Sequence, residues 1–408
     1  MNCRFCNNKL SHELVDLGFS PPSNSYLNSH QLNEPEVFFP LRIMVCDSCF
    51  LVQIDEFKDH SEIFNSEYAY FSSYSKSWLK HAENFAKVME AKLGLDENSK
   101  VIEIASNDGY LLQYFLKKGI SVLGIEPTGN TAQVAMNKGI DCIVDFFSHN
   151  LASELATRMI KADLLVGNNV LAHVPNINDF VSGLKILLKH DGVITMEFPH
   201  LLNLLGKNQF DTIYHEHFSY LSFTTVSKIF ESHGLEIFDV EEIFTHGGSL
   251  RIYAKHKEFV GFTVEERVHK MLEKEKANGL LQLKTFSSFQ EKVDLIKNSL
   301  LQFLIDAKKN SQKVVAYGAA AKGVTLLNFC GIKKDLISFV VDASPHKQNK
   351  FIPGVHIPIV NEVEIKKLKP DYVIILPWNL KNEISDQLQY IDSWGGQFVV
   401  AIPRIQVF

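Results

Sequence analysis

Residues 210–218 hold the densest group of titratable side chains in the chain, because Tyr214, His215, Glu216 and His217 follow one another. An imidazole titrates near neutral pH and can take a proton from a weak carbon acid. A carboxylate can orient that imidazole, and a phenol can donate a hydrogen bond to a developing oxyanion. The cluster therefore predicts base catalysis. The alternatives are a polar surface loop and a metal-binding loop, and the spacing differs from the His-Glu-x-x-His of helical zinc proteases.

Two Cys-x-x-Cys pairs, Cys3/Cys6 and Cys46/Cys49, lie near the N-terminus. Paired knuckles of this kind can supply four thiolates to one tetrahedral zinc ion. Four thiolates leave no open coordination position, so the predicted site is structural and supports a segment with little core of its own. Unrelated buried cysteines or redox-active pairs are the alternatives.

A strand-to-tight-turn pattern occupies residues 100–109, with the sequence KVIEIASNDG. The small residues Ala105, Ser106 and Gly109 allow a ligand to approach the backbone closely. Doubly wound folds bind cofactors at the carboxyl end of such a strand. The dinucleotide fingerprint G-x-G-x-x-G is absent, which disfavours a nicotinamide cofactor.

Polar and aromatic residues then follow successive predicted strands, as in enzymes that bind S-adenosylmethionine. Glu126 ends the second strand and can accept both ribose hydroxyls of an adenosine. Asp145 and Phe146 can meet the adenine amino group and ring face, and Asp108 can meet the ammonium group. The predicted cofactor-binding residues are Glu103, Ala105, Asn107, Asp108, Glu126, Pro127, Asp145, Phe146, Asn168 and Asn169. The ordered set predicts S-adenosylmethionine as the cofactor.

Strand and helix patterns alternate from residue 100 onward, which predicts a parallel sheet with helices on both faces. The predicted strands of this part are 101–104, 121–125, 163–166 and 192–197, with helices at 110–118 and 180–188. A charged helical stretch at 263–309 precedes four further predicted strands, at 313–317, 337–341, 372–376 and 398–402. We expect a zinc-binding module at 1–65, a central domain at 66–262, and a helical segment with a smaller α/β domain at 263–408.

Composition disfavours several classes of protein. The chain has 408 residues, of which 46% are hydrophobic, and its net charge is −6. A nucleic-acid partner usually requires a basic stripe, which this balance does not favour. The sequence contains no apolar run of membrane-spanning length, and its first residues lack the apolar core of a signal peptide. We therefore expect a cytoplasmic protein without a nucleic-acid or membrane partner, as a monomer or weak homo-oligomer.

Together these motifs resemble the sugar C-methyltransferases of deoxysugar biosynthesis, which act at carbon 3 of a dTDP-4-keto-6-deoxy sugar. The resemblance extends over essentially the whole chain. Besides the four cysteines it includes residues 67–73, 107–109, 124–127, 145–147, 169–175, 213–218, 246–248, 317–322, 328–331 and 347–349. Two positions depart from the family pattern, since Ala105 replaces a usual glycine and His215 stands where relatives can carry an acid.

The resemblance implies a role for each matching residue. His217 matches the general base that removes the proton beside the ketone, with Tyr214 and Glu216 flanking it. Tyr68 and His173 match residues that stabilise the enolate or place the sugar. The nucleotide is expected between the central and C-terminal domains. The expected substrate-binding residues are Tyr70, His246 and Lys322.

The resulting expectation is an α/β enzyme with an N-terminal zinc module, a Rossmann-like class I methyltransferase domain and a smaller Rossmann-like C-terminal domain. His217, oriented by Glu216, would generate the enolate that accepts the methyl group. Lys322 would bind the diphosphate of a dTDP-linked sugar, although a solvated lysine at a helix start is an equal alternative. An O-methyltransferase acting on a sugar or other small molecule, and a non-catalytic scaffold, are the rival functions.

Overall fold

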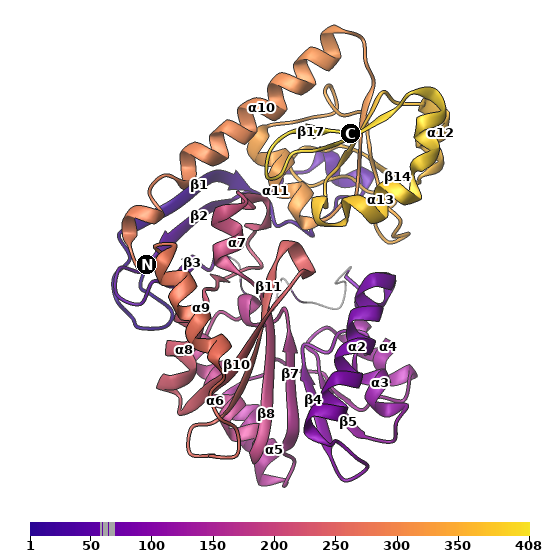
Figure 1. The fold of residues 1–408 in the computed structure, drawn as a ribbon. Helices are drawn as coiled ribbons and strands as arrows, with labels where there is room; N and C mark the ends of the chain where they lie inside the picture. The colour runs from indigo at the N-terminus through magenta and orange to yellow at the C-terminus, as the bar shows by residue number, and fades with distance from the viewer. Residues whose placement is uncertain (58, 60–63, 65–69) are drawn as a thin grey trace.

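The computed structural model describes residues 1–57, 59, 64 and 70–408. Three sheets of four, seven and six strands organise these residues (Figure 1). The seven-stranded sheet and its helices form the lower part of the view, and the six-stranded sheet forms the upper part with the C-terminus. The N-terminal strands lie between the two, beside the long helix α10.

The four-stranded sheet belongs mostly to the N-terminal module. Its order is β1 (His12–Ser20), β2 (Phe39–Val45), β3 (Val52–Ile54) and β9 (Ser219–Tyr220), all paired antiparallel. In β2, Leu41, Ile43 and Val45 are buried while Arg42 is exposed, which is the period-two pattern of a sheet with one covered face. Strand β9 begins two residues after His217, so the predicted catalytic segment is anchored in the edge of this sheet.

The seven-stranded sheet carries the cofactor motifs. Its strands, in spatial order, are β10 (Leu235–Ile243), β11 (Ser249–His256), β8 (Leu188–Pro199), β7 (Ala162–Asn168), β4 (Lys100–Ile104), β5 (Ser121–Ile125) and β6 (Cys142–Ile143). Strands β8, β7, β4, β5 and β6 are parallel, whereas β11 is antiparallel to both β8 and β10. The four strands predicted for this sheet are parallel, as expected, and β11, which was not predicted, makes the sheet mixed, because the short turn between β10 and β11 leaves no room for a crossover.

Helices cover both faces of this sheet, as predicted. One face packs against α2 (Lys76–Leu93), α3 (Leu112–Leu116) and α4 (Gly129–Asn137), and the other against α5 (His149–Thr157), α6 (Ile177–Leu187) and α8 (Phe223–Ser232). Helix α2 begins after Ser75, whose hydroxyl accepts the backbone N–H of Trp78, and ends at Gly94 in the left-handed conformation. Helix α7 (Leu201–Gly206) lies after β8.

The C-terminal part follows the helices α9 (Glu266–Ala277) and α10 (Phe289–Lys309). Its sheet has the order β14 (Ile359–Val360), β13 (Val340–Val341), β12 (Val314–Tyr317), β15 (Tyr372–Ile375), β16 (Gln397–Val400) and β17 (Gln406–Val407). The accompanying helices are α11 (Ala321–Cys330), α12 (Val363–Leu368) and α13 (Lys381–Gln387). All four predicted strands are present, β13 is shorter than predicted, and β14 and β17 add the two edges.

Short 3-10 helices connect these elements and shape the site. They are η1 (Ser29–Asn33), η2 (Ser72–Tyr74), η3 (Leu171–His173), η4 (Phe210–Thr212), η5 (Thr245–Gly247), η6 (Leu283–Thr285), η7 (Trp378–Leu380) and η8 (Gln389–Trp394). Among the described residues, no helix is both long enough and apolar enough to cross a membrane.

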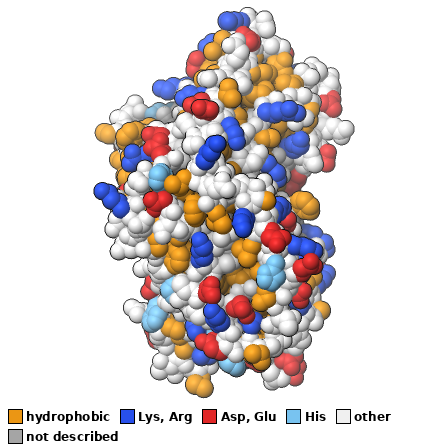
Figure 2. All heavy atoms as spheres, turned by 60° about the vertical axis from the view of Figure 1, so that its left-hand side comes forward, with side chains coloured by type: hydrophobic (Ala, Val, Ile, Leu, Met, Phe, Trp, Pro, Cys, Tyr) orange, Lys and Arg blue, Asp and Glu red, His pale blue; other side chains and the backbone are white. Residues whose placement is uncertain are grey.

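The N-terminal module packs directly on the C-terminal domain. Leu14 and Leu17 of β1 share one buried core with Leu300 of α10 and Leu327 of α11. The Tyr26 hydroxyl donates a hydrogen bond of 2.5 Å to the carbonyl of Ala319, just before α11. On the surface in Figure 2, positive and negative side chains are interspersed over the visible face and are not gathered into a stripe of one sign.

Candidate active site

A cavity of about 840 Å³ lies where the three parts of the chain meet. Its wall includes the turn after β4, the ends of β5 and β7, residues 212–217, the turn before β11 and the start of α11. This size suits a small-molecule ligand and its cofactor. The carboxyl ends of the parallel strands point to one edge of the central sheet, which is why residues distant in sequence converge there.

The turn after β4 adopts the tight conformation that its small residues predict. Ala105, Asn107 and Gly109 have φ angles of 57°, 50° and 73°. A left-handed alanine costs roughly 1–2 kcal/mol, so the surrounding contacts hold Ala105 in place. The Glu126 carboxylate accepts backbone N–H groups from Asn107 at 2.8 Å and Thr128 at 2.9 Å. Burial raises the pKa of Glu126, and these N–H groups oppose the increase.

Unsatisfied polar atoms in the cavity wall test whether a polar ligand fits there. In the described part of the chain, neither the oxygen nor the nitrogen of the Asn168 side chain has a hydrogen-bond partner. The same holds for the Asn169 side-chain oxygen. Buried polar atoms without partners are costly unless a ligand or water satisfies them. Together with Glu126, they provide the polar contacts expected for the amino-acid and ribose parts of S-adenosylmethionine.

The predicted cofactor residues divide into two groups by position. The cavity is lined by Ala105, Asn107, Glu126, Pro127, Phe146, Asn168 and Asn169. Glu103 is fully buried beneath the turn, and burial holds its pKa well above the usual value. Asp108 accepts the backbone N–H of Ser73 at 3.2 Å, and Asp145 is exposed and accepts that of Phe146 at 2.7 Å. These last three residues do not line the cavity, and their contact with the cofactor stays a prediction.

His217 is held by two hydrogen bonds that define its protonation. Its Nδ1 lies 2.9 Å from the carbonyl oxygen of Thr212, and its Nε2 lies 2.9 Å from the Tyr214 hydroxyl. A carbonyl can only accept, so Nδ1 carries the proton and the neutral ring presents Nε2 as the basic atom. Burial, with His173, His246 and Lys322 nearby, lowers the pKa of His217 well below the usual histidine value. The imidazole is therefore neutral at pH 7.

The structure corrects the expected role of Glu216, because this residue does not orient His217. Its carboxylate accepts hydrogen bonds from the side-chain amide of Asn24 at 3.0 and 2.8 Å, and from the Ser23 hydroxyl at 3.2 Å. Both partners belong to the N-terminal module. Residues 214–217 form a turn closed by the hydrogen bond from the His217 backbone N–H to the Tyr214 carbonyl at 2.9 Å, and adjacent side chains of a turn need not face each other. The Thr212 carbonyl orients His217 instead.

Two further histidines lie beside His217. The His173 Nδ1 donates to the backbone carbonyl of Glu216 at 2.7 Å, and its ring centre lies 4.6 Å from that of His217. The Asn169 amide donates to the His246 Nε2 at 3.1 Å. Burial lowers the pKa of His173 and of His246 to about 4. The cavity thus contains three neutral imidazoles at neutral pH.

A buried cation reaches the cavity from the C-terminal domain. The Lys322 Nζ donates to the Asn379 side-chain oxygen at 2.8 Å and lies 4.7 Å from the centre of the Trp378 ring. Burial lowers the pKa of Lys322 to about 8, and the Asp211 carboxylate opposes the decrease. Trp378 donates its indole N–H to the Asp211 carboxylate at 2.7 Å. This hydrogen bond joins the C-terminal domain to the catalytic segment, residues 210–218.

Other residues of the wall were not identified from the sequence. Trp78 and His81 lie one turn apart on α2, Trp78 stacks on Tyr110 at 5.7 Å, and His81 donates to the Glu197 carboxylate at 2.9 Å. Lys347 donates its Nζ to the carbonyl of Ala319 at 2.8 Å. The helical spacing of Trp78 and His81 and the Lys347-Gln348-Asn349 motif were the sequence features from which these wall residues could have been identified. Of the three predicted tyrosines, Tyr70 and Tyr214 line the cavity and Tyr68 lies outside the described residues.

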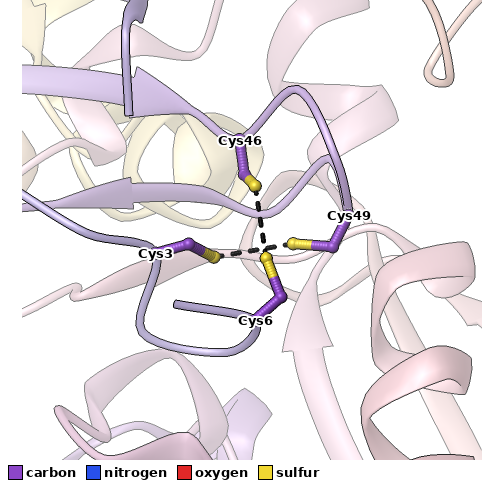
Figure 3. Close-up of side chains that lie close together, drawn as sticks. All are labelled: Cys3, Cys6, Cys46 and Cys49. Carbon is purple, nitrogen blue, oxygen red and sulfur yellow. Dashed lines mark hydrogen bonds between the residues drawn. The ribbon is translucent and has the colours of Figure 1, made fainter. Parts of the chain in front are cut away.

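The four N-terminal cysteines converge on one point (Figure 3). Their sulfur atoms all lie within 4.8 Å of one another, and the Cys3–Cys49 and Cys6–Cys46 pairs are 3.5 Å apart. Zinc–sulfur bonds of about 2.3 Å in a tetrahedron place sulfurs roughly 3.8 Å apart, so the arrangement fits zinc. The Gln53 side-chain amide donates to the Cys3 sulfur at 3.2 Å, as outer-shell groups of such sites do.

Comparison with known families matches all three parts of the chain. Residues 3–64 match a zinc binding domain, residues 78–240 a methyltransferase domain, and residues 244–403 a C-methyltransferase C-terminal domain. The chain is 33% identical over 405 residues to C-methyltransferase NovU of Streptomyces niveus, which covers 99% of this chain and 96% of NovU. The chain belongs to this C-methyltransferase family.

Membership confirms the family resemblance, the three-part α/β fold, S-adenosylmethionine as the cofactor and zinc as a structural metal. The protein is a C-methyltransferase. A ubiquinone biosynthesis O-methyltransferase of Bartonella quintana is 27% identical over 100 residues, which is 24% of this chain and 40% of that protein. The PH0226 protein of Pyrococcus horikoshii aligns with 49% of this chain and 100% of its own at 16% identity, with a TM-score of 0.39.

Proposed function

We propose that this C-methyltransferase methylates the carbon next to a ketone in a nucleotide-linked sugar, at carbon 3 of a 4-keto-deoxy hexose carried by dTDP. The observation that carries the proposal is the pair formed by His217 and Tyr214. One ring nitrogen of His217 is protonated and bonded to a backbone carbonyl, and the other is a free base in contact with a phenol. This arrangement can move a proton from carbon while a hydroxyl stabilises the oxygen beside it.

The proposed reaction begins with binding of the ketone oxygen by the Tyr214 hydroxyl. Burial and the nearby Glu216 hold the pKa of Tyr214 well above its usual value, so the phenol keeps its proton and remains a donor. Its hydrogen bond to His217 is thereby exchanged for one to the substrate. The released Nε2 of His217 then faces the carbon beside the ketone.

Proton removal follows at that carbon. The C–H bond breaks, the proton bonds to Nε2, and the electron pair spreads onto the ketone oxygen, where Tyr214 stabilises the negative charge. His173 lies against His217 and carries no charge at neutral pH, so it adds polar contacts without a competing cation. S-adenosylmethionine, when bound at Glu126 and Asn169, supplies an electrophilic methyl group.

We propose that the nucleotide binds at the start of α11. Lys322 and Lys347 bring two positive charges to the wall of the cavity there, and the backbone N–H groups at the beginning of a helix also favour an anion. A diphosphate bound at this position would leave the attached hexose to extend toward His217. Tyr70 and His246 line the same cavity and are proposed to contact the sugar.

Solvent exchange tests the proposal without methyl transfer. The protein is incubated in D₂O with S-adenosylhomocysteine and a dTDP-4-keto-6-deoxy hexose that lacks an oxygen at carbon 3, the carbon next to the ketone. Incorporation of deuterium at carbon 3 is followed by NMR. We expect exchange with the wild-type protein and a loss of about 10²–10⁴-fold in His217→Asn. Asparagine can still donate to the Thr212 carbonyl, so cofactor binding should persist. Unchanged exchange in His217→Asn would remove this residue as the base.

A further inference from the structure

Arg4 lies inside the zinc knuckle, between the first two cysteine ligands. Its backbone N–H donates to the Gln53 side-chain oxygen at 2.9 Å, and the amide of the same Gln53 donates to the Cys3 sulfur at 3.2 Å. Its backbone carbonyl accepts the side-chain amide of Asn178 at 3.3 Å. The main chain of Arg4 is therefore fixed by the metal-binding loop to which it belongs and by its hydrogen bonds with Gln53 and Asn178.

The side chain of Arg4 points away from the knuckle toward the cavity wall. Its Nη1 donates to the Pro175 carbonyl at 2.6 Å, and its Nη2 donates to the Ile54 carbonyl at 2.5 Å. The guanidinium also lies 5.4 Å from the centre of the Phe218 ring. Such a cation–ring contact and two charge-assisted hydrogen bonds define a single position for the group.

Two of these three partners, Pro175 and Phe218, belong to the segments that carry the cavity histidines, and Ile54 ends β3. Pro175 itself lines the cavity and follows His173 by two residues. Phe218 follows His217 directly, and its carbonyl accepts the backbone N–H of Ile54 at 3.2 Å. Arg4 thus contacts the His173 segment on one side and the His217 segment on the other, and Ile54 connects Arg4 to the His217 segment a second time.

We propose that Arg4 is a positioning residue, which uses the rigidity of the zinc knuckle to fix His173 relative to His217. The inference rests on the proposed function of these two histidines. The two imidazoles come from separate segments, which meet at the hydrogen bond from His173 to the Glu216 carbonyl, and Arg4 adds a contact to each segment beside that bond, where the two rings lie 4.6 Å apart. A displacement of about 1 Å in a catalytic group can cost about 10²-fold in rate. Zinc would then support catalysis through Arg4 without touching substrate.

The test compares three variants of the zinc-loaded, full-length protein. Arg4→Met keeps an unbranched apolar side chain in place of the stem but removes the guanidinium and both of its hydrogen bonds, and Arg4→Lys keeps the charge with one donor group. Arg42→Met is the matched control, because Arg42 belongs to the same module, is exposed and lies 3.8 Å from Glu13. Each variant is assayed for zinc content, S-adenosylhomocysteine affinity, KM, kcat, and hydrogen–deuterium exchange of backbone amides.

In Arg4→Met we expect kcat and the substrate-carbon exchange rate to fall about 10–100-fold, with KM changed less than about threefold. Zinc content and S-adenosylhomocysteine affinity should match the wild type, and backbone exchange should rise in peptides covering 173–177 and 216–220. Arg4→Lys should recover part of kcat, and Arg42→Met should resemble the wild type throughout.

Three other results would overturn the inference. They are an unchanged kcat in Arg4→Met, a loss of zinc that accounts for the loss of rate, and a rise in KM with constant kcat. Failure of the proposed function gives a different result, since the wild-type protein would then show no exchange at the substrate carbon. If Arg4→Met does not fold, an Arg4→Lys variant with full kcat and normal backbone exchange would equally refute the positioning role.

Discussion

Replacing Tyr214 with phenylalanine tests the central pair of the proposed mechanism. The variant removes one oxygen atom and leaves the ring, which is buried and lies 4.0 Å from the His217 ring between centres. Among residues 1–57, 59, 64 and 70–408, the hydrogen-bond partner of the hydroxyl is the Nε2 of His217 at 2.9 Å. Packing and the other His217 bond, to Thr212, should therefore persist.

The expected loss of rate follows from the role assigned to the hydroxyl. A donor aimed at a developing oxyanion contributes about 10²–10³-fold to kcat, which is about 2.7–4 kcal/mol. A net hydrogen bond that only stabilises the folded state is worth about 0.5–1.5 kcal/mol and would not change kcat in this way. We therefore expect kcat to fall at least about 10²-fold while the midpoint of thermal unfolding moves by a few degrees.

The pH dependence of kcat/KM gives a second, independent test of this pair, because the direction in which its acid limb moves can be predicted. Neutral His217 is the reactive form, and burial places its pKa well below the usual value, so the titration of His217 should leave kcat/KM constant through neutral pH and lower it in acid. The Tyr214 hydroxyl donates to Nε2 and so favours the neutral ring. Its removal raises the pKa of His217, and the acid limb of the profile should move to higher pH.

Steady-state kinetics of methyl transfer from pH 4.5 to 9, at saturating S-adenosylmethionine, would measure both effects. His233→Gln provides a control, because that histidine is outside the cavity and bonds to Asn178 at 3.0 Å. A Tyr214→Phe variant with wild-type kcat would refute the oxyanion role. An acid limb that moves to lower pH would refute the inferred direction of the Tyr214–His217 hydrogen bond.

Other predictions follow from the same geometry. Glu126→Gln should weaken S-adenosylhomocysteine binding about tenfold or more in calorimetry, because it removes a charge-assisted acceptor; wild-type affinity would exclude this residue from the cofactor site. Lys322 loses its charge as the pH rises through about 8, so KM for the nucleotide sugar should increase there, and Lys322→Met should abolish that pH dependence. Gly247→Ala should destabilise the protein by about 1–3 kcal/mol, because φ is +92° and the new carbon would lie 2.3 Å from Trp378; an unchanged unfolding midpoint would contradict it. Chelation of zinc should lower the unfolding midpoint and abolish substrate-carbon exchange, with recovery on adding zinc back, and insensitivity to the chelator would argue against a structural metal.

Local sequence was sufficient wherever a feature depends on residues close together in the chain. The spacing of the cysteines identified the zinc ligands, and their four sulfurs do converge. Alternating buried strands and helices predicted the two α/β sheets, since these periodicities follow from backbone geometry. The mixed character of the central sheet was missed, because a short connection carries no apolar pattern of its own and β11 is as buried as its parallel neighbours.

For the catalytic site, by contrast, the sequence showed which residue types are present but not which of them contact each other. Tyr214, Glu216 and His217 are adjacent, and adjacency alone suggested that the carboxylate orients the imidazole. The fold directs Glu216 toward Asn24 and gives His217 the carbonyl of Thr212, because each side chain's direction is set by the backbone after η4 and by the pairing of β9 with β3.

Tertiary structure also decided which distant residues share the cavity. Asn24, Trp78 and Lys347 line the cavity from three different parts of the sequence, and no local pattern connects them to His217. Their proximity depends on the packing of the zinc module between the two α/β domains, which buries β1 against α10 and α11. Sequence therefore determined the cofactor, the metal and the residue types of the chemistry, because these follow from local motifs. The protonation of His217, the correction of Glu216 and the positions of the cations came from long-range packing, which sets burial and hydrogen-bond partners.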